Sequence, residues 1–319
     1  MDEMQDPKVN TQEDDGSGEW TQLELKREHR IFAAVILAYG LAAILYHAII
    51  GHDLGRIAVM FIGLPTLLAA MLSLAPPAQT SAGSIMKGIT LFLLLVAPLM
   101  GEGYLCILIA SPLFYLVGAM VATVVNIVRE RQDNKLGACA LLLLPFCFEG
   151  TIPMLTLPRE QSVEATQVVL ATPDEVQRAL AQPVRVTTKM PWLLRIGFPR
   201  PDQSRGDGLA VGSTRTLHFT GAETAPPGWL ISQVDASRPG YVHFTVTQDH
   251  TKVTEWVRWR SSEVTWHAVD ATHTQVTWRI QYARGLDPAW YFGPWERVVV
   301  TQCAHYLIRA SATPAEASL

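Results

Sequence analysis

Residues 276–298 read V-T-W-R-I-Q-Y-A-R-G-L-D-P-A-W-Y-F-G-P-W-E-R-V, and they join two kinds of periodicity. At the start, Val276, Trp278, Ile280 and Tyr282 alternate with other residues, which is the period of a β-strand with one apolar face. Glycines and prolines then break the pattern, and the following residues have the period of an α-helix. The stretch therefore predicts a strand that leads into a C-terminal helix, with the apolar face of the strand pointing to that helix.

The C-terminal helix is predicted from about Asp287 to about Arg309 and is irregular as far as Pro294. One largely apolar stripe is expected along it, made of Trp295, Val298, Val299, Gln302, Tyr306 and Leu307. The helix can therefore cover the apolar face of a sheet.

Shorter elements precede this pair. Residues 162–171 alternate as a strand, and Thr172, Pro173 and Glu175 then supply an N-cap, a proline at the first helical position and a capping glutamate. A helix is predicted from there to about Ala181. A second helical stretch is expected at 191–198, and strands are expected at 212–220, 228–235, 241–247, 253–260, 262–269 and 274–282, with a tight turn at 270–273.

This order of elements predicts an α+β domain at residues 159–312, in which an antiparallel sheet wraps around the long C-terminal helix. A curved sheet cannot bury its concave face alone. The helix is therefore expected to close it and to leave a cavity between the two layers. Residues 313–319 are expected to form a tail.

The N-terminal half differs in composition. The chain is 49% hydrophobic and only 17% charged, below the roughly 25% of an average soluble domain. Eight of the nine tryptophans follow residue 190, whereas the long aliphatic runs precede residue 158. Residues 26–158 are therefore predicted to form a membrane all-α helical bundle, after a disordered acidic leader at 1–25 that lacks the features of a signal peptide.

The bundle is predicted to have about five spans. They are expected at 31–50, at 57–74, twice within the apolar block 85–128, which Gly101-Glu102-Gly103 splits into a helical hairpin, and at 136–157. Two prolines and Glu149 weaken the last span, which is expected to end as early as Glu149. Four spans are therefore the alternative.

Cationic residues set the orientation of the bundle, because they are retained on the cytoplasmic side. They precede the first and third spans and follow the fourth, as Lys26, Arg27, Arg30, Lys87, Arg129, Arg131 and Lys135, whereas the alternate turns hold only Arg56. The N-terminus is therefore predicted in the cytoplasm. Five spans put the C-terminal domain outside the cytoplasm, and four keep it inside.

With five spans, Asp53, Glu102 and Glu149 all reach the outer membrane face. Ionisable groups at membrane depth are costly, so these three form a predicted polar cluster. The alternative is that each carboxylate caps a helix end in interfacial water.

The C-terminal half resembles the START/polyketide cyclase-like superfamily, also called Bet v 1-like or SRPBCC. The resemblance is carried by V-V-L-A-T-P-D-E-V-Q-R-A-L at 168–180, V-G-S-T-R at 211–215, F-T-G at 219–221, T-Q-V-T-W-R-I-Q-Y at 274–282 and L-D-P-A-W-Y-F at 286–292. It covers about residues 162–312, and Gln177 stands where many members have a tryptophan. The attached bundle looks like that of membrane-attached bacterial members. The resemblance implies a helix-grip fold with a cavity for a hydrophobic ligand, and no cofactor is expected.

Two kinds of residue are candidates for ligand contact. The guanidinium groups of Arg215 and Arg279 can bind an acidic headgroup through two hydrogen bonds, or can form ordinary cross-strand ion pairs. An aromatic set at the strand-helix junction can line the cavity, pack in the core or meet lipid headgroups; it consists of Trp278, Tyr282, Trp290, Tyr291, Phe292 and Trp295.

Together these features predict a protein of the bacterial inner membrane that binds or transfers a lipid or other hydrophobic small molecule. The sequence has no G-x-S-x-G, H-E-x-x-H, P-loop or dinucleotide motif. A cyclase- or hydrolase-type enzyme that uses a cavity histidine or the outer-face carboxylates is one alternative, and a ligand-free membrane scaffold or sensor is another. The candidate histidines are His218, His243, His267 and His305.

Two classes of partner are not expected. The net charge of -4 gives no basic field for nucleic acid. The four cysteines have no C-x-x-C pairing, and His47 and His52 are five residues apart, off the spacing that aims two imidazoles at one ion, so no metal site is expected.

Overall fold

The computed structural model describes residues 17–50, 62–76, 78–100, 104–130, 149, 156–221 and 226–313. The chain divides into two compact units. One consists of Met1–Ala78 and Thr90–Pro98, and the other of Gln79–Ile89 and Leu99–Leu319.

Four helices are described in the N-terminal part, namely α1 (Ser17–Ile50), α3 (Leu64–Leu74), α4 (Ser81–Met100) and α5 (Tyr104–Glu130). They overlap the first four predicted spans, although α3 covers only residues 64–74 of the span predicted at 57–74, and α5 begins directly after the predicted break at 101–103. Helix α1 begins inside the segment that was predicted as a leader. Asp53, Glu102 and most of the fifth predicted span lie outside the described residues.

Small side chains bring α1 and α3 together in the first unit. Ala33 of α1 packs with Ala69 and Ala70 of α3, and Gly40 lies so close to Thr66 that a Cβ on it would overlap the threonine side chain. Small residues let the backbones of two helices approach closely. This is a common packing mode for helices in lipid, where the hydrophobic effect does not drive association.

The helices expose much of their apolar surface. Leu41 of α1 is 58% exposed and Leu108 of α5 is 70% exposed. Two helical segments, Arg27–Leu45 and Cys106–Asn126, are long and apolar enough to cross a membrane, and the apolar segments Leu64–Leu74 and Ser81–Val96 are shorter.

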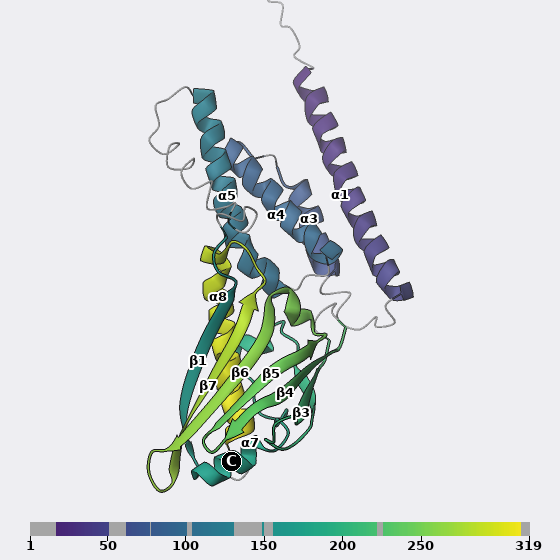
Figure 1. The fold of residues 1–319 in the computed structure, drawn as a ribbon. Helices are drawn as coiled ribbons and strands as arrows, with labels where there is room; N and C mark the ends of the chain where they lie inside the picture. The colour runs from purple at the N-terminus through teal and green to yellow at the C-terminus, as the bar shows by residue number, and fades with distance from the viewer. Residues whose placement is uncertain are drawn as a thin grey trace, which may run out of the picture. The chain divides into compact units, whose positions relative to one another are not determined.

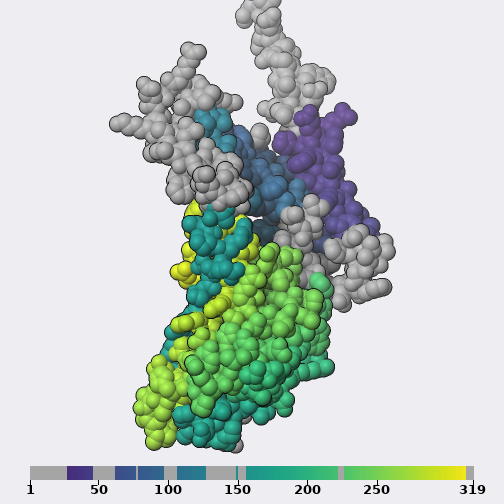
Figure 2. Space-filling model, viewed as in Figure 1, coloured from purple at the N-terminus to yellow at the C-terminus, as the bar shows by residue number. Residues whose placement is uncertain are grey.

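The C-terminal half contains a seven-stranded antiparallel sheet with the strand order β1-β7-β6-β5-β4-β3-β2 (Figure 1). The strands are β1 (Glu160–Leu170), β2 (Pro201–Arg205), β3 (Thr214–Phe219), β4 (Gly228–Arg238), β5 (Tyr241–Asp249), β6 (Val257–Ala268) and β7 (His273–Arg284). The view in Figure 2 shows the outer face of the sheet as a continuous surface of side chains.

Two strand predictions need correction. The predicted strands 253–260 and 262–269 are one strand, β6, after a short 3-10 helix, η4 (Lys252–Glu255). The predicted break falls where the β6–β7 register shifts between Trp259 and Ser261, so the irregularity is a bulge that bends a continuous strand. Strand β2 was not predicted, because its sequence P-D-Q-S-R has no apolar alternation.

The residues that flank the short helices decide where these helices begin and end. Helix α7 (Pro173–Leu180) has the predicted capping box, in which Thr172 and Glu175 bond to each other's backbone N–H. The helix predicted at 191–198 is only a 3-10 turn, η3 (Leu193–Arg195), because Pro191, Gly197 and Pro199 bound it closely. The predicted turn at 270–273 is confirmed, since Asp270 accepts hydrogen bonds from the N–H groups of Thr272 and His273.

The long helix α8 (Ala289–Leu307) continues into a π-helical turn, η5 (Ile308–Ala312), and packs on β1 and β7. The sheet curls around it, as predicted for a helix-grip fold (Figure 1).

The buried face of α8 is rotated from the predicted stripe. Phe292, Glu296, Val300 and Ala304 are buried at four-residue spacing, whereas Trp295 and Val298 are 45% and 48% exposed. Valine and alanine let the helix approach the sheet closely, which the bulkier predicted stripe would prevent. From the predicted stripe, Tyr306 is buried.

Candidate functional site

An apolar interior lies between the concave face of the sheet and α8. Val276, Trp278, Ile280 and Tyr282 of β7 are each at most 4% exposed and share one cluster with Val300 of α8. The prediction that this face of the strand points to the helix is therefore confirmed.

Three polar groups that border this interior have no hydrogen-bond partner within the described part of the chain. They are the Trp278 ring N–H, the Glu296 Oε2 atom and the Tyr306 hydroxyl. The three side chains come from residues that are only 4%, 4% and 5% exposed. Buried polar groups usually have partners, so each is a point where a water molecule or a polar group of a ligand can bind.

Glu296 is the most perturbed of these groups. Its Oε1 atom accepts a hydrogen bond of 3.1 Å from the N–H of Leu286. Burial raises the pKa of Glu296 to about 7, because the low-dielectric interior disfavours its charge. Burial and the nearby Glu296 charge also raise the pKa of Tyr282 to about 12. Glu296 can therefore gain or lose a proton near neutral pH.

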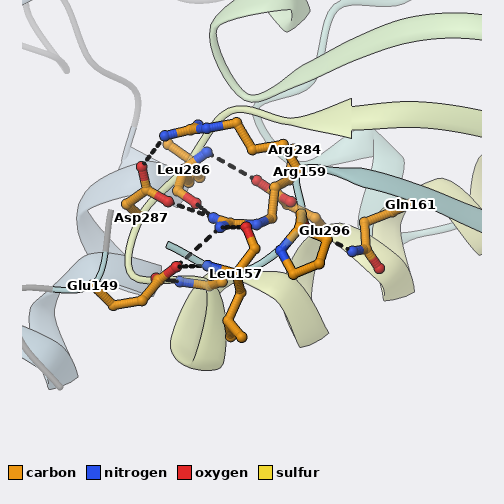
Figure 3. Close-up of polar contacts among 10 residues, drawn as sticks. Glu149, Leu157, Arg159, Gln161, Arg284, Leu286, Asp287 and Glu296 are labelled. Carbon is orange, nitrogen blue, oxygen red and sulfur yellow. Dashed lines mark hydrogen bonds and ion pairs between the residues drawn. The ribbon is translucent and has the colours of Figure 1, made fainter. Parts of the chain in front are cut away.

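A network of charged residues closes the end of the interior where β7 leads into α8 (Figure 3). Arg284, only 2% exposed, donates to Glu149 Oε1 at 3.0 Å and to Asp287 Oδ1. It also donates to the carbonyl oxygens of Leu157, at 2.9 Å, and Leu286, at 2.8 Å. Charge-assisted bonds of this kind are the strong ones in a buried site.

Glu149 joins the chain before β1 to this network. Its Oε2 atom accepts the N–H of Ala289, and its Oε1 atom accepts the N–H of Leu157 at 2.9 Å (Figure 3). Ala289 is the first residue of α8, so the carboxylate also lies at the positive end of the helix dipole. The structure thus shows Glu149, predicted for an outer-face polar cluster, as a partner of α8 and β7.

The aromatic residues at the start of α8 point in different directions. Phe292 is buried, whereas Trp290 and Trp295 are 36% and 45% exposed. The Tyr291 hydroxyl donates to the carbonyl oxygen of Ile109 in α5 at 2.5 Å. Burial raises the pKa of Tyr291. The candidate aromatic set is therefore divided between the interior, α5 and the surface.

The two candidate arginines lie on opposite faces of the sheet. Arg215 is buried, donates to the carbonyl oxygens of Leu180 and Gly208, and has its guanidinium 4.9 Å from the centre of the Phe244 ring. Burial lowers its pKa to about 10. Arg279 faces outward.

Three of the four candidate histidines, those in the strands, lie on the outer face of the sheet. His243 contacts Asp235 at 2.6 Å, and His218 contacts Asp202 at 2.5 Å, on residues that alternate with the buried ones of their strands. His267 is exposed, and His305 contacts Gln167. Gln167 lies on the same face of β1 as the buried Val163 and Val169, so His305, which is half-buried, is the one of these four histidines that borders the interior.

Sequence reasoning missed Glu296, Arg284 and Asp287. The available signal was the spacing of Phe292, Glu296 and Val300, which puts a carboxylate on the buried stripe of α8. A charged residue there looks like the polar face of an amphipathic helix until the sheet position is known.

Neither a protein-family model nor a curated protein matches the chain. Solved structures match its C-terminal half. A Zhui aromatase/cyclase from Streptomyces sp. R1128 is 16% identical, with 47% of this chain and 93% of that chain covered and a TM-score of 0.32. A START superfamily protein from Mycobacterium smegmatis is 11% identical, with coverage of 47% and 92% and a TM-score of 0.34.

Norcoclaurine synthase from Thalictrum flavum is 11% identical, with coverage of 47% and 85% and a TM-score of 0.32. The fold assignment depends on the topology of the sheet and on the position of α8.

Proposed function

We propose that the chain is a membrane-anchored protein of the START/SRPBCC type, and that it binds or transfers a lipid or other hydrophobic small molecule between its sheet and α8. The observation that carries this proposal is the buried interior in which Trp278, Glu296 and Tyr306 keep unpartnered polar atoms among apolar side chains. Apolar contact would supply affinity, at about 25 cal/mol per Å² buried, and the polar atoms would set the orientation of the ligand.

The membrane part of the proposal is supported by the exposed surface of the helices. Ile31, Val35 and Leu41 of α1 are 55% to 58% exposed, and Leu116 and Val121 of α5 are 42% and 46% exposed. Soluble proteins rarely expose contiguous apolar surface of this kind, whereas lipid covers it without cost.

The proposed location of the domain is outside the cytoplasm. Tyr291 bonds to Ile109, which is close to the N-terminal end of α5. At the other end, Arg129 lies in the last turn of α5 and Arg131 follows the helix in the sequence. Since cationic ends stay in the cytoplasm, the contact supports a domain on the opposite side. This agrees with five predicted spans rather than four, in a bacterial inner membrane.

The proposal that the chain binds an apolar ligand is tested by native mass spectrometry and lipid extraction of the full chain purified in mild detergent. The wild type is expected to retain an apolar molecule. Ala304→Leu adds volume to the interior cluster and should reduce the retained amount, whereas Ala268→Leu, at an exposed position at the end of β6, should not. A wild-type protein that retains no apolar molecule would contradict the proposal.

Glu296 favours the enzyme alternative, because a carboxyl group with a pKa near 7 can act as a general acid or base. The variant Glu296→Gln, whose side chain has a similar shape but does not titrate, distinguishes binding from catalysis. If the domain only binds, the variant keeps ligand retention and no conversion is detected in either protein. If it is an enzyme, the wild type converts the extracted ligand and the variant loses conversion but not retention.

A further inference from the structure

One face of α8 points away from the sheet and carries large apolar side chains. Trp290, Trp295 and Val298 are 36%, 45% and 48% exposed, and Tyr291 is half-buried. At about 100° per residue, Tyr291 lies between Trp295 and Trp290 around the helix. These four residues are called the α8 outer face below.

The α8 outer face is continuous with α5. The Tyr291 hydroxyl donates to the carbonyl oxygen of Ile109. The apolar segment of α5 is Cys106–Asn126, so Ile109 is about 5 Å from its N-terminal end. If α5 crosses a bilayer, the Tyr291 hydroxyl lies near the boundary between hydrocarbon and headgroups.

Pro112 lies in the turn of α5 that Tyr291 contacts. Proline has no N–H, and its ring displaces the carbonyl four residues earlier, so the Leu108 oxygen loses its helical partner. Ser111 replaces that partner, with its Oγ donating to Leu108 at 3.1 Å. Tyr291 reaches the adjacent carbonyl, of Ile109. The contact therefore lies beside the carbonyl that Pro112 leaves without its helical donor.

Exposure alone does not single out this face. Val269, in the turn between β6 and β7, is 55% exposed, and Leu170, paired with His273 in the sheet register, is 62% exposed. Both lie at the other end of β7, whose 12 residues extend over about 40 Å. What distinguishes the α8 outer face is its bond to α5 and its two tryptophans, the residue type favoured at membrane interfaces.

We propose that the α8 outer face lies in the headgroup region of the bilayer beside α5, with Trp290 and Trp295 as interfacial anchors. Exposed Arg297, next to this face, adds a cation for lipid phosphates. The surface rests on the proposed function, because it requires α5 to cross the membrane. It fixes the β7–α8 end of the interior at the bilayer surface, where a lipid ligand would enter or leave.

The test compares labels at three positions of similar exposure in the full chain reconstituted into phosphatidylcholine and phosphatidylglycerol vesicles. The four native cysteines are replaced by alanine, and a fluorophore is attached in turn to Leu116→Cys in α5, Trp295→Cys and Val269→Cys. These positions are 42%, 45% and 55% exposed. The quenchers are lipids that carry a nitroxide on the headgroup or at the end of an acyl chain.

Headgroup nitroxides are expected to quench the Trp295→Cys label several-fold more than the Val269→Cys label. Acyl-chain nitroxides are expected to quench the Leu116→Cys label most. A second variant, Pro294→Cys, keeps both tryptophans and labels the exposed Pro294 position, and it should behave like Trp295→Cys.

The outcomes separate the two proposals. Quenching at Leu116→Cys with equally little quenching at Trp295→Cys, Pro294→Cys and Val269→Cys would overturn the interfacial surface and leave the membrane proposal standing. No quenching at Leu116→Cys would overturn both. Crosslinking between two copies at Trp295→Cys without lipid quenching would assign the face to a second copy of the chain and also overturn the lipid surface.

Discussion

Strand β7 carries two arginine-glutamate pairs in opposite environments. Arg284 and Glu149 are 3.0 Å apart, with side chains 2% and 7% exposed, whereas Arg279 and Glu164 are 2.7 Å apart, with side chains 48% and 46% exposed. The distances are similar, but water solvates only the second pair. The comparison shows that burial, rather than the ion-pair distance, decides how much the loss of one partner costs.

The largest expected effect comes from Arg284→Met, which leaves the carboxylates of Glu149 and Asp287 without their buried cation. Breaking a buried pair by removing one partner costs about 3–5 kcal/mol. The thermal midpoint of the full chain in nanodiscs should therefore fall by at least about 6 °C.

Arg284→Lys is the matched control for this change. It keeps the charge but not the planar fork that reaches several acceptors, so its midpoint should lie between those of the wild type and Arg284→Met. A midpoint of Arg284→Met within about 2 °C of the wild type would mean that the network is solvated in the native protein.

The second effect depends on pH. The pKa of Glu296 is about 7 in the folded chain and 4.5 in its ordinary state, so the folded protein holds a proton there that the unfolded chain releases. Stability therefore decreases as pH rises from about 5 to about 8. Glu296→Gln should have little effect at the lower pH and stabilise the chain by up to about 3 kcal/mol at the higher pH.

Thermal melts of wild type and Glu296→Gln at several pH values check this prediction. The two curves of midpoint against pH should converge at low pH and separate as pH increases. Parallel curves would show that Glu296 is ionised and solvated in the folded state. Glu255→Gln, an exposed carboxylate on η4, serves as the control.

A smaller effect is expected for the coupling energy between the two side chains of the buried pair, Arg284 and Glu149. In a double-mutant cycle with Glu149→Gln and Arg284→Met, the coupling energy should be about 1–3 kcal/mol, because the two side chains share one buried network. Additive effects would indicate that Glu149 acts mainly through its bond to Ala289. The cycle thus separates ion pairing from capping of α8.

The smallest effect is expected at the exposed pair. Arg279→Ala and Glu164→Ala should each change stability by less than about 1 kcal/mol, since solvent screens the pair. Hydrogen bonding to Glu164 raises the pKa of Arg279, but this side chain is charged at every relevant pH. If Arg279→Ala destabilised the chain as much as Arg284→Met, burial would not explain the difference between the pairs.

Local sequence patterns determined much of the fold. The alternation of Trp278 and Tyr282 set the buried face of β7, and Thr172 and Glu175 set the start of α7, because both depend on neighbouring residues along one element. The long apolar runs predicted the N-terminal helices for the same reason.

Tertiary structure alone decided the face of α8, the continuity of β6 and the partners of the charged residues. The apolar pattern of α8 allows more than one buried stripe, and only the approach of the sheet selects Phe292, Glu296 and Val300. Arg284 and Glu149 are 135 residues apart in sequence, and no local rule brings them together. The site residues that depend on such long-range contacts become visible only in the folded chain, where burial gives them their unusual chemistry.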